Sequence, residues 1–255
     1  MSFYVGSFRF LNSAYPVTFR FGHNAAMTAI VSTYHSNVFC IGADGLRMDP
    51  SGSVADEHAQ KIFYHEGGDL RLAFALAGCT TIFSGDKSFD FIAATRSIVE
   101  LVAPSVDSFP NFMQVFNITL YEILRATFGT TLRGLPPDLI VRILFVGYFN
   151  NQPCRAEIEI CHQNLEIQRP TINEIQVPAE VKFGVFSGSQ EMYKLFAPNL
   201  IEPRTQSAAV TLVRDYIQLC INHRGKEPDC ANIDGHIHIA AITPQGFVWV
   251  IPPIS

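Results

Sequence analysis

Three side chains in the first quarter of the sequence have types that could do nucleophilic chemistry. Thr28 carries a hydroxyl, Asp44 lies sixteen residues later, and Lys61 lies thirty-three residues after Thr28. A threonine hydroxyl is a poor nucleophile until a nearby base takes its proton, and an amine can be that base. A carboxylate beside a buried lysine would keep the lysine charged and oriented. The three groups could therefore attack a carbonyl carbon if the fold brings them together.

The elements that must position these residues can be predicted from apolar and β-branched patterns. The predicted strands are 28–32, 37–43, 59–65, 70–77, 139–149, 154–161, 181–186, 236–242 and 247–251, and the predicted helices are 82–102, 109–128 and 207–223. Strands come first, then two helices, then strands again, which indicates layered α+β packing in place of alternating βαβ units.

The composition indicates one domain with a deep core. Apolar residues make up 48% of the 255 residues and charged residues only 16%, which argues against disorder. The net charge is −5 and no basic run of five or more occurs, so no nucleic-acid partner is expected. Charged residues interrupt every candidate membrane span. Six cysteines without a CxxC pair, and an N-terminus without a basic region, indicate a cytoplasmic protein.

Four short segments carry a resemblance to a known family. They are TAIVS at 28–32, IGADG at 41–45, DEHAQKIF at 56–63 and ALAG at 75–78. Together they resemble the catalytic half of proteasome β-type subunits and of the bacterial two-ring ATP-dependent threonine peptidase, which are N-terminal-nucleophile hydrolases. Beyond residue 80 the resemblance is limited to Ser187-Gly188-Ser189 and the closing strands. It implies a four-layer αββα sandwich over residues 28–255.

The resemblance also implies a role for each residue of a catalytic set. Thr28 would be the nucleophile, and its own α-amino group would be the base if it is the first residue of the chain. Lys61 would lower the pKa of that amine, and Asp44 would orient Lys61. The backbone N–H of Gly78 would stabilise the oxyanion. The full predicted set is Thr28, Asp44, Lys61, Gly78, Ser187 and Asp229, with Asp234 open as the alternative to Asp229.

A substrate pocket follows from the same resemblance. Its predicted residues are Ala59, Phe63, Leu76 and Thr80, which carry no charge. Apolar residues before the scissile bond are therefore expected. The family further implies a peptide or unfolded-protein substrate, a homo-oligomeric ring and a partner ATP-dependent unfoldase. No cofactor is expected, and His236 and His238 lack a third ligand for a metal ion.

The residue before the predicted nucleophile departs from the family pattern. Self-processing members have a glycine there, and this chain has Met27, although the bacterial two-ring relative begins Met-Thr. Residues 1–27 are therefore an N-terminal extension that is a propeptide, a mis-assigned start or a permanent arm. With a permanent arm, the protein would be a non-catalytic ring or scaffold subunit. A non-proteasomal hydrolase of small amides on the same fold is the other alternative.

Overall fold

The computed structural model describes most of the chain from Thr28 onward. The described residues are 28–48, 53–84, 86–129, 139–163, 166–168, 170–175, 183–201 and 203–254. The predicted N-terminal extension, residues 1–27, lies outside them. The division of the chain into this extension and a hydrolase domain over 28–255 therefore stays a prediction.

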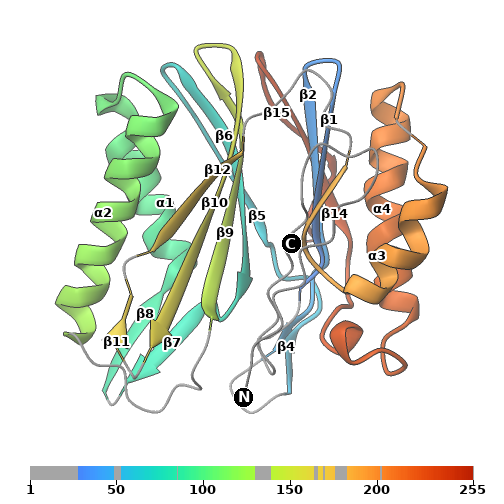
Figure 1. Ribbon diagram of the computed structural model, residues 1–255, viewed down its shortest axis with the longest axis horizontal. Coiled ribbons are helices and arrows are strands. Elements are labelled where there is room, and N and C mark those ends of the chain that lie inside the picture. Colours follow the sequence, from blue (N-terminus) through green and yellow to red (C-terminus); the bar gives the residue numbers. More distant parts are fainter. Residues whose placement is uncertain are drawn as a thin grey trace.

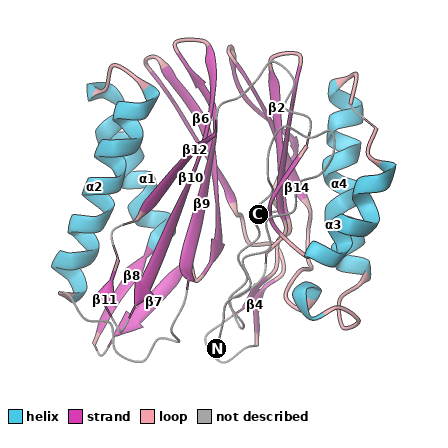
Figure 2. Ribbon diagram, in the orientation of Figure 1, coloured by secondary structure: helices cyan, strands magenta, loops and turns pink. Residues whose placement is uncertain are grey.

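Two antiparallel sheets face each other at the centre of the molecule (Figures 1 and 2). The five-stranded sheet has the order β13 (Gly184–Ser187), β1 (Ile30–His35), β2 (Val38–Ala43), β14 (His238–Thr243) and β15 (Gly246–Ile251). The six-stranded sheet has the order β11 (Glu166–Ile167), β10 (Gln152–Gln163), β9 (Leu139–Phe149), β6 (Leu70–Gly78) and β5 (Ile62–Gly67), and β12 (Thr171–Ile175) pairs with β10. The expected α+β class is confirmed.

Helices cover the outer face of each sheet (Figure 1). Helices α1 (Phe91–Val102) and α2 (Phe109–Phe128) pack on the six-stranded sheet, whereas α3 (Gln190–Phe196) and α4 (Gln206–Asn222) pack on the five-stranded sheet. Alternate residues of each strand point to opposite faces. In β9, Leu144 and Val146 therefore enter the core between the sheets, while Ile143 and Phe145 enter the core under α1 and α2. No described helix has the length and apolar character needed to cross a membrane.

The helix predicted over 82–102 is wrong in its first part. Two short strands, β7 (Thr81–Ser84) and β8 (Lys87–Asp90), form a hairpin before α1. Ile82 and Phe89 are paired across this hairpin and both are buried. Their apolar side chains therefore belong to a strand pair and not to one face of a helix. The carboxylate of Asp90 then accepts the N–H groups of Ile92 and Ala93 and caps α1.

Other elements agree more closely with their predictions. Helix α2 and strand β9 have the predicted bounds. The turn between β1 and β2 lies at Ser36 and Asn37, whose φ angles of 49° and 62° belong to a tight two-residue hairpin turn. The sequence did not predict the short strands β3 (Arg47–Met48) and β4 (Val54–Asp56), nor α3, β11 and β12.

Candidate functional site

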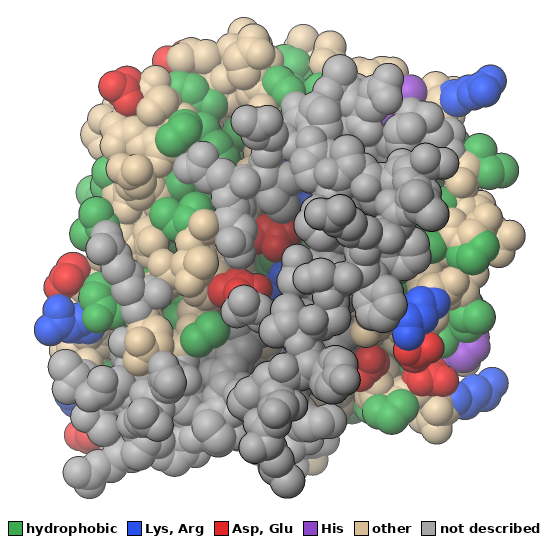
Figure 3. Space-filling view, in the orientation of Figure 1, with side chains coloured by type: hydrophobic (Ala, Val, Ile, Leu, Met, Phe, Trp, Pro, Cys, Tyr) green, Lys and Arg blue, Asp and Glu red, His purple; other side chains and the backbone are tan. Residues whose placement is uncertain are grey.

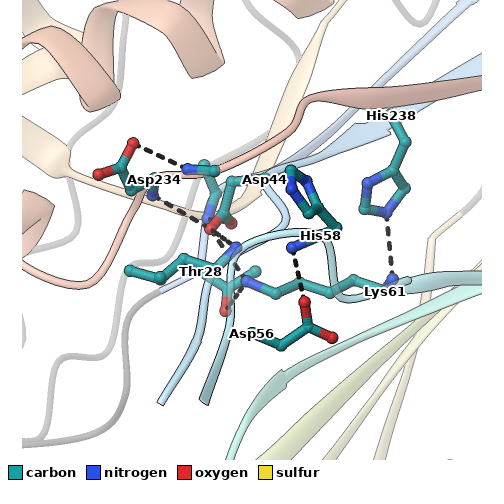
Figure 4. A network of polar contacts seen from close by, with 10 residues as sticks. Thr28, Asp44, Asp56, His58, Lys61, Asp234 and His238 are labelled. Carbon is teal, nitrogen blue, oxygen red and sulfur yellow. Dashed lines mark hydrogen bonds and ion pairs between the residues drawn. The ribbon is translucent and has the colours of Figure 1, made fainter. Parts of the chain in front are cut away.

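The structure brings Thr28, Asp44 and Lys61 together at one end of the sheets (Figure 4). The Nζ of Lys61 lies 3.1 Å from Oγ1 of Thr28 and 3.0 Å from Oδ2 of Asp44. Thr28 precedes β1, Asp44 follows β2, and Lys61 precedes β5, so the ends of strands from both sheets supply the three side chains. All three residues are buried, with Asp44 fully enclosed. The ammonium group thus links a carboxylate to a hydroxyl inside the protein.

Backbone N–H groups hold the carboxylate of Asp44 in place. The N–H of Ala29 donates to Oδ1 at 2.9 Å, and the N–H groups of Leu46 and Asp234 donate to Oδ2 at 3.2 and 3.4 Å. Burial raises the pKa of Asp44, and Lys61 and the backbone N–H groups oppose that rise. Asp44 therefore has a fixed position from which to orient Lys61.

Burial also shifts the pKa of Lys61. It lowers the pKa of the Lys61 ammonium, because a charge is poorly solvated there, and the Asp44 carboxylate opposes the shift. A lysine with a lowered pKa is a better proton acceptor near neutral pH than an exposed lysine. Because Nζ lies within hydrogen-bond distance of Oγ1, Lys61 itself can take the proton of Thr28. The sequence alone indicates the α-amino group of Thr28 for that task.

Three backbone segments meet tightly behind the ion pair, and glycines permit the approach. A Cβ atom added to Gly45 would lie 2.8 Å from the carbonyl oxygens of Glu57 and His236. Gly235 has a φ of 81°, which side chains rarely adopt, and it packs against the carbonyl of Glu57. The segments that carry Asp44, Lys61 and Asp234 are therefore locked against one another.

The remaining residues of the predicted catalytic set, Gly78, Ser187 and Asp229, lie on other elements than Thr28, Asp44 and Lys61. Gly78 ends β6 with a φ of 98°, and Ser187 ends β13 opposite Ile30, two residues after Thr28 along β1. Asp229 lies in the 3₁₀ turn η3 (Pro228–Cys230). Of the two acids left open by the sequence, Asp234 joins the network in Figure 4: its N–H contacts Asp44, and its carboxylate pairs with Arg224.

The predicted pocket residues lie mostly inside the protein. Phe63 and Leu76 are 8% and 2% exposed and belong to the core under α1 and α2, where Phe63 stacks on Phe74. Ala59 is also buried, whereas Thr80 is partly exposed. The role of these residues in substrate binding stays a prediction.

One residue of the site was not predicted in its observed role. The backbone N–H of Lys61 donates to Nε2 of His238 at 3.1 Å, and His238 is fully buried. From the sequence, a metal-binding role for this histidine is set aside because no third ligand is present, and its contact with Lys61 is not predicted. Among the described residues, no group of three or more His, Cys, Asp or Glu side chains is placed to hold a metal ion.

The chain is similar in fold to solved structures of Anbu (ancestral beta-subunit) proteins. It is 11% identical to Anbu from Yersinia bercovieri, with a TM-score of 0.55 over 88% of this chain and 87% of that one. It is 12% identical to an Anbu (Gly-1) mutant from Hyphomicrobium sp. strain MC1, with a TM-score of 0.56 over 89% and 87%. No protein-family model and no curated protein matches the chain. The chain therefore shares the fold of these Anbu proteins.

These comparisons correct the family expected from the sequence. Assignment to the proteasome β-type and bacterial two-ring peptidase family is wrong, because no family model matches and the similar structures are Anbu proteins. The segments that carried the resemblance include β1 and the end of β2, both buried between layers. Small and β-branched residues suit any strand in such a position, so these segments indicate the fold more than the family.

Proposed function

We propose that this chain is a threonine-type peptidase subunit in which Thr28 cleaves amide bonds. The observation that carries the proposal is the contact of Lys61 with both Oγ1 of Thr28 and the carboxylate of Asp44. A nucleophile, a proton acceptor and a group that orients the acceptor are the parts that nucleophilic catalysis needs. The helix-covered pair of sheets supports an αββα sandwich of the N-terminal-nucleophile hydrolase type, and the likeness to Anbu supports it further.

The proposed reaction begins with a proton transfer. Lys61 first loses its ammonium proton to solvent; its neutral amine then takes the proton from Oγ1 of Thr28, and Oγ1 attacks the carbonyl carbon of the scissile amide. The backbone N–H of Gly78 stabilises the oxyanion of the tetrahedral intermediate. The C–N bond then breaks, the leaving amine takes the proton from Lys61, and an ester on Thr28 remains. Water attacks this ester with Lys61 again as the base, which releases the acid and restores Thr28.

A free α-amino group at Thr28 would be a second proton carrier beside the nucleophile. It exists only after the Met27–Thr28 bond has been broken or if the chain starts at Thr28. Its ordinary pKa is about 7.7–8.0, so it is partly neutral at physiological pH. We therefore propose that the active protein begins at Thr28.

The substrate and the assembly follow from the same proposal. Peptides or unfolded proteins with apolar residues before the scissile bond would fit the uncharged residues Ala59, Phe63, Leu76 and Thr80. The structurally similar Anbu protein is described as a beta-subunit, which supports assembly with other chains, and we propose that this assembly is a homo-oligomeric ring. A cytoplasmic location and an ATP-dependent unfoldase partner complete the proposal.

Two measurements test the proposed function together. The intact mass of protein from its native host should correspond to a chain that begins with Thr28. Thr28→Ala should abolish peptide hydrolysis, whereas Thr127→Ala, the same change on the outer helix α2, should leave it unchanged. Native chains that all begin at Met1 or Ser2, together with a Thr28→Ala variant as active as wild type, would contradict the proposal and favour a scaffold protein.

A further inference from the structure

We propose that His238 is a positioning residue of the site, whose imidazole fixes the backbone of Lys61 and thereby the reach of Nζ to Thr28. The hydrogen bond between Lys61 and His238 joins residues 177 positions apart. The effect of this hydrogen bond on catalysis rests on the proposed function, whereas the existence of the bond does not. It can therefore be tested separately.

Lys61 needs this partner because of its place at the edge of a sheet. The strand β5 is the last strand of the six-stranded sheet, and its ladder with β6 begins at Ile62 opposite Ala75. The backbone N–H of Lys61 precedes that ladder, and the imidazole of His238 accepts it instead. A buried backbone N–H without a partner is strongly unfavourable, so this bond selects one backbone conformation for Lys61.

His238 is itself part of a rigid frame that includes the other half of the ion pair. It opens β14 and pairs with Ala43 of β2, the residue directly before Asp44. Trp249 packs edge-on against the imidazole with ring centroids 6.1 Å apart. The imidazole thus connects the backbone of Lys61 to the strand that places Asp44. Movement of either segment would change the distance from Nζ to Asp44.

The imidazole stays neutral, as an acceptor must. Burial and the nearby charge of Lys61 lower the pKa of His238 to about 3. With Nε2 accepting, the ring proton lies on Nδ1, which is buried and makes no well-formed hydrogen bond among the described residues, although the backbone of His236 lies beside the ring. An apolar side chain would fill this space without an unsatisfied N–H. What histidine adds here is the acceptor for Lys61.

Three substitutions of His238 separate the acceptor from the packing. In His238→Gln the amide oxygen is as many bonds from Cα as Nε2, whereas in His238→Asn it is as many as Nδ1. His238→Leu removes the acceptor and keeps an apolar volume. We expect kcat of the Asn and Leu variants to fall by about 10–100-fold with KM nearly unchanged, since a displaced catalytic group loses rate on this scale. The Gln variant should retain most of the wild-type kcat.

Hydrogen exchange of the Lys61 amide gives a second readout that needs no activity. In the full chain, the amide should exchange slowly in the wild type and the Gln variant, and much faster in the Asn and Leu variants. Thermal melting shows which variants are folded. If His238→Leu does not fold, the comparison of His238→Gln with His238→Asn still tests the proposal. Equal exchange in Gln and Asn variants, or equal kcat in both, would overturn the proposal. If the wild type hydrolyses nothing, the proposed function fails, and the exchange rates still decide whether His238 holds Lys61.

Discussion

Two groups of charged side chains, one buried and one partly buried, differ in what their positive charges contact. At the strand ends, Lys61 contacts one carboxylate and one hydroxyl. On β9 and β10 of the six-stranded sheet, two arginines and two glutamates contact one another: Arg142, Arg155, Glu157 and Glu159. We call these four residues the Arg–Glu network.

The Arg–Glu network connects the two sheets. Arg142 lies 3.2 Å from Glu157 and 3.3 Å from Glu159, and Arg155 lies 3.1 Å from Glu157. Arg142 also donates to the carbonyl of Phe186 in β13 at 2.6 Å and lies over its ring at 4.5 Å. Figure 3 shows acidic and basic side chains close together near the centre of the face turned to the viewer.

The difference shows how a structural ion pair can be told from a candidate catalytic one. In the Arg–Glu network the charges neutralise each other and tie β9 and β10 to β13. In the site, Asp44 satisfies only part of Lys61, and the remaining contact is to the hydroxyl of Thr28. A guanidinium is also unable to lose its proton in a protein, whereas a buried lysine can. Burial of the charges therefore does not distinguish the two groups. What distinguishes them is the additional contact of Lys61 with the hydroxyl of Thr28.

The largest expected effect comes from breaking the site. Lys61→Ala should lower turnover by about 10²–10⁴-fold, the usual contribution of a general base, and should lower the free energy of unfolding by about 3–5 kcal/mol, because Asp44 stays buried without a partner. Lys61→Arg is the matched control, since it keeps the charge but cannot accept a proton, and it should also be inactive. Peptide hydrolysis and denaturant unfolding measure both effects. An active Lys61→Arg variant would show that Lys61 is not the base.

Acid should lower the free energy of unfolding through His238, which contacts the candidate site. The pKa of His238 is about 3 in the folded protein and about 6.5 in the unfolded chain. Between these values the unfolded chain binds more protons, so the stability present above pH 6.5 is lost as pH falls towards 3. The loss from this one group should reach about 3 kcal/mol at pH 4.

A variant without the titrating ring provides the control for this pH dependence. His238→Gln should show a shallower fall of unfolding free energy between pH 7 and pH 4, measured by urea unfolding at each pH. Parallel curves for the wild type and His238→Gln would mean that His238 titrates normally in the folded protein.

A smaller effect is expected from the Arg–Glu network. Glu157→Ala removes the carboxylate shared by Arg142 and Arg155 and should lower the free energy of unfolding by about 1–3 kcal/mol, less than full burial would give because the side chains are 9–13% exposed. Glu157→Gln keeps the volume and isolates the charge. Turnover per folded molecule should stay close to wild type. A loss of turnover as large as that of Lys61→Ala would remove the distinction between the two groups.

The smallest effect is expected on the surface. Lys194 and Glu191 form an exposed ion pair on α3, with side chains 50% and 54% exposed. Solvent screens such a pair, so Lys194→Ala should change the free energy of unfolding by less than about 0.5 kcal/mol. Urea unfolding of this variant sets the baseline for the buried groups, and a change above about 2 kcal/mol would contradict the ranking.

Much of the fold could be predicted from local signals. Helix α2 was predicted with its bounds because it has a steady apolar period and Gly129 at its C-terminus; the structure adds Ser108 as its N-cap. The hairpin β7–β8 was missed because its apolar residues Ile82 and Phe89 also fit a helical spacing. A short hairpin and the first turns of a helix differ little at that length.

The site could be predicted only where residue type and strand position coincide. Thr28 and Lys61 lie in predicted strands and Asp44 directly follows one, but the expectation that they meet came from the spacing shared with a known family and not from local patterns. The contact of His238 with Lys61 depends on which strand of one sheet faces the edge of the other. The Arg–Glu network depends on the register of β9 and β10, in which Arg142 lies opposite Glu159. Local patterns carry no information on these tertiary relations.

The most direct test of the central claim is to locate the acyl group on the enzyme. The purified protein is treated with an electrophilic peptide that acylates hydroxyl groups irreversibly, and tandem mass spectrometry identifies the modified residue. We expect one modified residue, Thr28 at the N-terminus of its chain, and no modification in Thr28→Ala or Lys61→Arg. Modification of Ser187 or Cys79 in place of Thr28, or equal modification of Thr28→Ala, would contradict it.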